Sequence, residues 1–251
     1  MSTKIFSKEE WVGVLEGLKE AYRVFVPVKE GDYHNFRLLE NGTRPNFDFQ
    51  NTRLSAKSVV YPQSERMFEY SLDSEDEDAQ RLKETEKDFS PQVVVGIRPC
   101  DASAFKLVQR NFDNPDYRDP WWVKRYESTT LVGLGCNEPC TTCFCASAGS
   151  GPFDPKGLDV LLHDIGDAYV AKSLTDKGDA WLDKAGGKEA GKAAVKQAES
   201  LTREVAGKIT SRIATDRLKD KKVNALYEAP FWEEVAFSCI NCGTCTYLCP
   251  T

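Results

Sequence analysis

Apolar residues near the start of the chain recur at the spacing of a helix. Trp11, Leu15 and Leu18 follow one another at intervals of four and three residues, so they share one helical face. Ser7 and Glu10 precede this stripe as a capping box, in which each side chain binds a backbone amide left free by the first turn. The pattern predicts a helix over residues 8–20.

Short apolar runs next predict a pair of strands. The segments 23–29 and 35–39 are rich in aromatic and branched residues, and the Gly31-Asp32 pair between them is typical of a turn. The segment 41–69 has no clear period and is expected to be mostly loop.

Two further runs, 92–97 and 129–134, are mostly apolar, as expected of strands buried on both faces. Segments at 101–110 and 121–126 that suit helices separate them. The order strand, helix, strand predicts parallel pairing of the two runs. Between the first pair of strands and this unit, five carboxylates within residues 73–78 predict a solvated loop.

The second half of the chain predicts a hairpin and a long helix. Residues 158–165 and 168–171 flank a Gly166-Asp167 turn and form the hairpin pattern. From 188 to 218 the chain is rich in Ala, Lys and Glu, and apolar residues recur every three or four positions. We expect this stripe to pack on the main domain; its members are Val195, Ala198, Leu201, Val205, Ile209 and Ile213.

Composition narrows the class of protein. The 251 residues include 39 acidic and 33 basic side chains, for a net charge of −6, which argues against binding to nucleic acid. No apolar run approaches the roughly 20 residues that cross a bilayer, and the start lacks the pattern of a secretion signal. We therefore expect a cytoplasmic protein without membrane insertion.

Nine cysteines dominate the candidate chemistry. Eight of them fall within the short segments 136–145 and 239–249, and Cys100 stands alone. Disulfide frameworks are typical of small exported domains, whereas this spacing in a reducing compartment favours metal ligation.

The downstream segment matches the bacterial ferredoxin run Cys-x2-Cys-x2-Cys-x3-Cys-Pro. Thiolates on a tightly curled loop reach the corners of one 4Fe-4S cubane, and Gly243 gives the loop the freedom to turn amides toward its sulfurs. A structural zinc site is the competing interpretation of Cys-x2-Cys spacing, but the third cysteine and the Cys-Pro ending favour a cluster. The candidate ligands are Cys239, Cys242, Cys245 and Cys249.

In two-cluster ferredoxins the fourth cysteine of this run binds the other cluster. The sequence ends at Thr251 without a second motif. Three explanations follow: a chain that continues, a ligand from a partner, or one cluster that uses all four thiolates. We favour the first, so the motif is expected to be incomplete at its C-terminus and to hold one or two clusters.

The upstream thiols follow the two predicted parallel strands. Carboxyl ends of parallel strands commonly carry sites, so Cys100 and the segment 136–145 are expected to converge. Five thiols exceed the four corners of one cubane; we assign Cys100, Cys136, Cys140 and Cys143 as ligands and Cys145 as the spare.

A Cys-x3-Cys-x2-Cys run is also typical of radical S-adenosylmethionine enzymes, in which one iron stays open. Too few residues follow the run here to complete a barrel of about 200 residues or more. A catalytic cluster of this kind and a zinc-stabilised binding module remain the alternatives.

Three motifs together resemble the 4Fe-4S dicluster electron-transfer subunits. They are the segments 96–101, 135–145 and 239–251. This family includes the beta chain of soluble sulfhydrogenases, one of the iron-sulfur chains of anaerobic sulfite reductase, and iron-sulfur subunits of heterodisulfide-reductase-like complexes. The resemblance implies electron relay in anaerobic metabolism, between a flavin subunit that meets NAD(P) and a partner that performs the reduction.

Nothing in the chain indicates catalysis of its own. It contains two histidines, neither in a metal-spaced pair, and no glycine-rich dinucleotide fingerprint. We predict a non-catalytic iron-sulfur subunit of an oxidoreductase complex, with three parts. They are an α/β domain with a mixed sheet at 1–154, a hairpin and amphipathic helical connector at 155–235, and a ferredoxin-like motif at 236–251.

Overall fold

The computed structural model of the chain describes residues 2–251, apart from the side chain of Val223. Its centre is a mixed sheet of eight strands in the order β10-β1-β9-β8-β7-β6-β2-β3. Neighbours in the run β2-β6-β7-β8 are parallel, and the other pairs are antiparallel. The strands are β1 (Thr3–Ser7), β2 (Arg23–Glu30), β3 (Tyr33–Leu38), β6 (Gln92–Ile97), β7 (Thr129–Leu134), β8 (Val160–Asp164), β9 (Ala168–Ser173) and β10 (Lys188–Glu189). The α/β character and the mixed sheet predicted from the sequence are confirmed.

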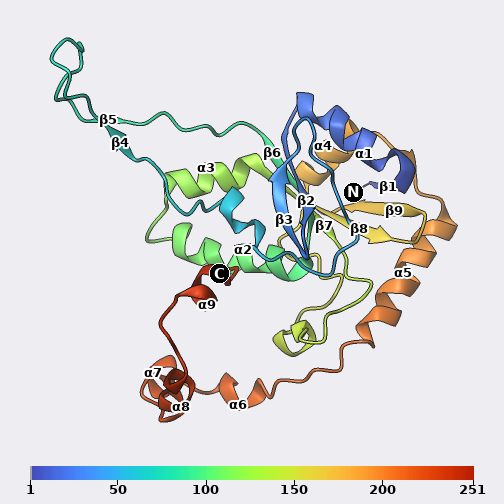
Figure 1. Cartoon of the computed structure of the whole chain (residues 1–251). Coiled ribbons are helices and arrows are strands. Elements are labelled where there is room, and N and C mark those ends of the chain that lie inside the picture. Colours follow the sequence, from blue (N-terminus) through green and yellow to red (C-terminus); the bar gives the residue numbers. More distant parts are fainter. Residues whose placement is uncertain (1) are drawn as a thin grey trace.

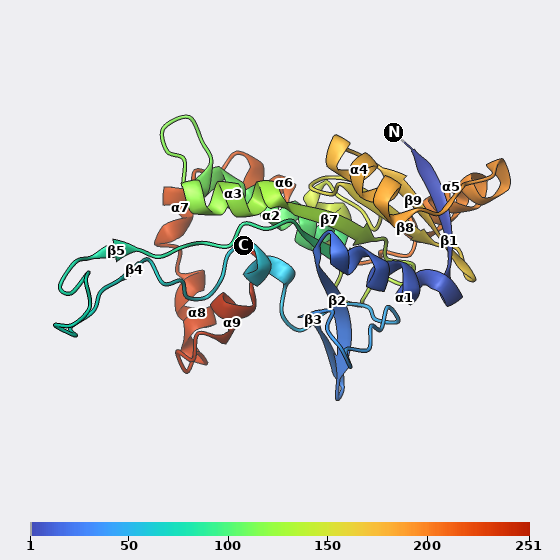
Figure 2. The same cartoon turned by 90° about the horizontal axis from the view of Figure 1, so that it is seen from above.

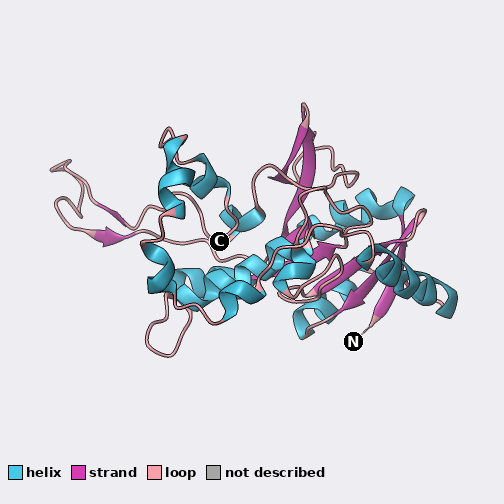
Figure 3. Cartoon of the chain, turned by 90° about the horizontal axis from the view of Figure 1, so that it is seen from below, coloured by secondary structure: helices cyan, strands magenta, loops and turns pink. Residues whose placement is uncertain are grey.

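Hydrophobic cores cover both faces of this sheet. On one face, Trp11 and Leu15 of α1 (Lys8–Gly17) pack with Trp181 of α4 (Asp176–Ala185) against side chains such as Val93. On the other face, α2 (Pro99–Phe112), α3 (Pro120–Ser128) and α5 (Lys192–Ala206) pack against side chains such as Val94. Figure 3, coloured by secondary structure, shows helices around the central strands. The alternation of Val93 and Val94 between two cores explains why β6 is buried along its whole length.

The start of the chain follows the predicted helix closely. Ser7 caps α1, with its Oγ accepting the Glu9 N–H at 3.2 Å, and the chain continues through the 3-10 helix η1 (Leu18–Glu20). Trp11, Leu15 and Leu18 are buried. The sequence did not predict β1, a short and mostly half-buried strand that pairs with β9 and β10.

The two central strands pair as predicted. β6 and β7 are parallel, fully buried, and separated along the chain by α2 and α3. Their register shifts between Val95 and Ile97, where Gly96 has a φ of 94°. An added Cβ at Gly96 would lie 3.1 Å from the ring of Phe47, so both the backbone angle and the space favour glycine. The irregularity redirects the end of β6 just before Arg98 and Cys100.

The predicted hairpin forms β8 and β9, which join the same sheet as β7. The predicted helix over 188–218 is wrong at both ends. Its first residues form β10, and α5 begins after Gly191 and ends at Gly207, because glycine favours helix termini over helix interiors. Ala198 and Val205 are buried as the stripe predicted, whereas Ile213 lies beyond the helix and is 47% exposed. The helix α4 was not predicted.

Two parts project from this body. Strands β4 (Phe68–Glu69) and β5 (Lys83–Glu84) form a small sheet in an arm, with the acidic segment 73–78 at its exposed tip, as Figures 1 and 2 show. After α6 (Asp216–Lys219), the chain forms α7 (Val223–Tyr227), α8 (Phe231–Phe237) and α9 (Thr244–Leu248), which lie apart from the sheet in the same views. No helix among residues 2–251 is long and apolar enough to cross a membrane.

Candidate metal centre

The ends of β6 and β7 bring the upstream cysteines to one edge of the sheet. β6 ends at Ile97, and Cys100 lies in the first turn of α2, whose first residue is Pro99. β7 ends at Leu134, and Cys136 follows two residues later. Because the strands are parallel neighbours, their carboxyl ends lie side by side. The predicted convergence of these two cysteines has a direct structural basis.

Cys143 is the common neighbour of the upstream thiols. Burial raises the pKa values of Cys100, Cys136, Cys140 and Cys145, and repulsion from the nearby Cys143 adds to the rise in each. The Cys140 N–H also donates to the Cys143 Sγ at 3.1 Å. This hydrogen bond places Cys140 in direct contact with Cys143.

Burial has the largest influence on the pKa values of these thiols. Cys100 is exposed as a residue, yet enough protein surrounds its sulfur that desolvation raises its pKa to about 12, with Asp101 adding repulsion. Burial raises the pKa of Cys136 to about 11, and the nearby Arg98 partly opposes this effect. At neutral pH the thiols of Cys100 and Cys136 by themselves are protonated, so metal binding to them would release protons.

The surroundings offer groups that suit an anionic cluster. The Ser150 N–H donates to the carbonyl of Cys145 at 3.0 Å, and the Cys136 N–H donates to the carbonyl of Pro152 at 3.0 Å. The Ser150 hydroxyl is buried and makes no hydrogen bond within the described residues. A buried hydroxyl without a partner, on a residue bonded to the Cys145 backbone, is a donor suited to cluster sulfur. The donor set of soft thiols and this hydroxyl fit an iron-sulfur cluster.

A site for a single metal ion requires a different arrangement of ligands from a site for a cluster. Within residues 2–251, no three or more His, Cys, Asp or Glu side chains are arranged to hold one metal ion. Thiolates at the corners of a cubane lie farther apart than ligands around one ion, and their spacing is set when the cluster binds.

The C-terminal motif is more open than the upstream group. Cys239, Cys242 and Cys245 are exposed, and Cys249 is half-buried. Asn241 and Gly243 have positive φ values of 55° and 72°, which curl the loop before α9.

Local hydrogen bonds favour thiolates in this motif. Bonds to Thr244 lower the pKa of Cys242, and bonds to Thr251 lower that of Cys249. The Lys57 ammonium donates a hydrogen bond to the carbonyl of Cys249. Because Lys57 lies in the 3-10 helix η2 (Ala56–Val59), this bond connects the C-terminal motif to that helix. No sequence signal indicated this role of Lys57.

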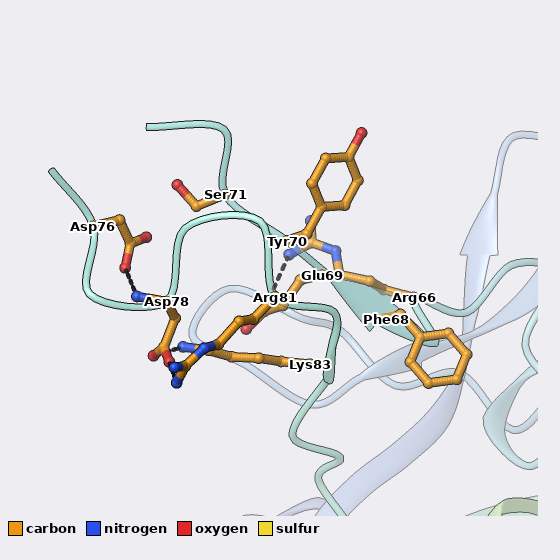
Figure 4. A pocket seen from close by; sticks show the side chains of 9 residues that line it. All are labelled: Arg66, Phe68, Glu69, Tyr70, Ser71, Asp76, Asp78, Arg81 and Lys83. Atoms are coloured by element: carbon orange, nitrogen blue, oxygen red, sulfur yellow. Dashed lines mark hydrogen bonds and ion pairs between the residues drawn. The ribbon is translucent and has the colours of Figure 1, made fainter. Parts of the chain in front are cut away.

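A hollow of 550 Å³ adjoins the upstream cysteines. Arg98, Gly135, Asn137 and Glu138 contribute to its wall, as do residues 47–50 of the loop after β3. No sequence signal assigned a role to this loop, because it lacks a period or motif. A second hollow of 440 Å³ lies in the arm, where Asp78 pairs with Lys83 and Arg81; Figure 4 shows that no cysteine contributes to it.

Comparison with known proteins supports the resemblance found in the motifs. The chain is 25% identical over 238 residues to "Sulfhydrogenase 2 subunit beta" of Pyrococcus furiosus, in an alignment that covers 93% of this chain and 67% of that protein. No family model and no solved structure matches the chain. This match confirms the similarity to a sulfhydrogenase beta subunit that the cysteine motifs predicted.

Proposed function

We propose that this chain is an iron-sulfur electron-transfer subunit of a hydrogenase-type oxidoreductase complex in the cytoplasm. The observation that carries the proposal is the position of Cys100 and Cys136 directly after the adjacent carboxyl ends of β6 and β7, together with similarity over most of the chain to a sulfhydrogenase subunit. Clustered thiols that lack disulfides are typical of metal ligation.

One 4Fe-4S cluster is proposed for the upstream group, with Cys100, Cys136, Cys140 and Cys143 as ligands. One or two clusters are proposed for Cys239, Cys242, Cys245 and Cys249, as the start of a ferredoxin-like unit. When bound, the clusters supply one-electron redox chemistry. The chain's own residues hold the thiolates, shield the upstream site from water, and donate hydrogen bonds to it.

The partners in this proposal are a flavin subunit that binds NAD(P) and a hydrogenase, sulfite reductase or heterodisulfide-reductase-like subunit. Electrons pass between them through this chain, which transforms no substrate. The division into 1–154, 155–235 and 236–251 also stays a proposal; strands β8 and β9 of the middle range are hydrogen-bonded into the same sheet as β7.

Counting metal and sulfide in anaerobically purified protein tests the proposal. We expect iron and acid-labile sulfide in equal amounts, about four or more of each per chain. Zinc without sulfide would instead identify a zinc-stabilised module. Reductive cleavage of S-adenosylmethionine by the purified chain would identify a catalytic cluster.

A further inference from the structure

The Arg98 side chain connects the segments that carry the upstream cysteines. Its Nη1 donates to the carbonyls of Leu134 and Gly135, at 3.2 and 2.9 Å, and Gly135 directly precedes Cys136. Arg98 is also the N-cap residue of α2, two residues before Cys100. One guanidinium therefore fixes the end of β7 relative to the start of α2.

The same guanidinium also holds the loop after β3. Its Nε donates to the carbonyl of Gln50 at 2.9 Å, and its Nη2 donates to the carbonyl of Phe49. The Phe49 ring centroid lies 4.2 Å from the guanidinium carbon, within the range of a cation–π contact. Lysine has no planar fork and does not reproduce this set of contacts.

Arg98 is a buried cation without a bonded counter-ion. The residue is 6% exposed, and its hydrogen bonds go to carbonyls. Within the described residues, no carboxylate lies at ion-pair distance from it. Asp101 is close enough to feel its charge, but burial still raises the Asp101 pKa to about 6. Carbonyl dipoles alone compensate a buried charge poorly, so its position between the segments that carry Cys100 and Cys136 calls for a functional reason.

We propose that Arg98 is a positioning residue that aligns Cys100 with Cys136 and supplies the positive charge that compensates the anionic thiolate-bound cluster. This inference rests on the proposed function and concerns how the upstream site is tuned. The ligated cluster gains negative charge when it is reduced, and a fixed cation nearby favours the reduced state. Arg98 therefore raises the midpoint potential of the upstream cluster.

Two substitutions separate the charge from the contacts. Arg98→Lys keeps the positive charge but loses the fork of hydrogen bonds, whereas Arg98→Met loses both. Arg125→Met is the matched control. Arg125 is also largely buried and donates to a carbonyl, that of Val60, but it pairs with Glu65 and lies in α3, before the amino end of β7. A strand of six residues, about 20 Å long, separates that end from Cys136.

The measurement is an anaerobic redox titration followed by paramagnetic resonance, with iron and sulfide counted in each sample. We expect a lower midpoint potential for the upstream cluster in Arg98→Met than in Arg98→Lys, and a wild-type value in Arg125→Met. Selective loss of the upstream cluster in Arg98→Met, with Arg98→Lys still loaded, also supports the charge role.

Two outcomes overturn the inference. One is full loading with wild-type potentials in both Arg98 variants. The other is equal loss of the upstream cluster from both variants with a lowered melting temperature, which would reduce Arg98 to a structural tie. A wild-type chain without iron and sulfide would contradict the proposed function instead, so the two failures are distinguishable.

Discussion

The backbone amide of Cys140 donates to the Sγ atom of Cys143 at 3.1 Å, while the Cys143 amide donates to the Cys140 carbonyl at 3.0 Å. The two bonds close a tight turn that holds Cys143 among the other thiols. An amide directed at a thiolate also stabilises its charge, as in iron-sulfur proteins generally.

Cys143→Ser should therefore remove the upstream cluster. Cys143 is one of the four assigned ligands, and its loss leaves only three of them for the cluster. We expect iron content to fall by about four atoms per chain. Cys145→Ser is the control, because Cys145 is assigned as the spare thiol. Equal loss of iron in the two variants would contradict that assignment.

Cys242→Ser should act on the C-terminal motif alone. Cys242 lies on the exposed loop before α9, outside the sheet that holds the upstream thiols. We expect the resonance signal of the upstream cluster to persist while total iron and sulfide fall together. Loss of both signals at once would show that the two sites assemble as one unit.

Gly135→Ala should disturb the upstream site through packing. A Cβ at this position would lie 2.1 Å from the Phe153 ring, so the strand end before Cys136 has to shift. We expect a loss of about 1–3 kcal/mol in unfolding free energy and lower cluster content. Gly151→Ala is the matched control, because a Cβ there meets no atom within 4 Å. Equal stability of the two variants would contradict the packing argument.

His163 should make the fold less stable in mild acid. Burial lowers its pKa from 6.5 to about 4, and its ring stacks on Phe153 with centroids 4.9 Å apart. Between these two pH values the unfolded chain binds a proton that the folded chain does not. Stability is therefore fully present above pH 6.5 and falls toward pH 4, by up to about 3 kcal/mol.

His163→Phe keeps the stacking and removes the titration. Denaturant unfolding at about pH 7.5 and about pH 5, on either side of the ordinary histidine pKa, should show a smaller acid loss in this variant than in the wild type. Subtracting the acid loss of stability in the variant from that in the wild type leaves the contribution of His163, because other groups that titrate over the same range contribute to both proteins. Parallel losses in both proteins would rule out His163 as the cause.

The sequence predicted the central strands and the convergence of the upstream cysteines because both depend on local patterns. Apolar runs mark β6 and β7, and the helices between them require parallel pairing, which brings Cys100 and Cys136 together. The N-terminal helix was predicted for the same reason, since Ser7 and the apolar stripe are local signals.

Other features depend on contacts between distant segments. The carbonyls of Phe49 and Gln50 reach Arg98 from a loop without a period, and β1 is a strand only because β9 and β10 lie beside it. The end of α5 was missed because an apolar stripe continued past Gly207, where the helix stops. The stripe still marked Ile209 as buried, but beyond the end of the helix it failed at Ile213, which is exposed.

The central claim is that thiolates of this chain hold iron-sulfur clusters, and low-temperature paramagnetic resonance of the anaerobic, dithionite-reduced protein tests it most directly. We predict signals of reduced clusters, one of which disappears in Cys143→Ser and another in Cys242→Ser. A colourless wild-type protein without any such signal would contradict the account.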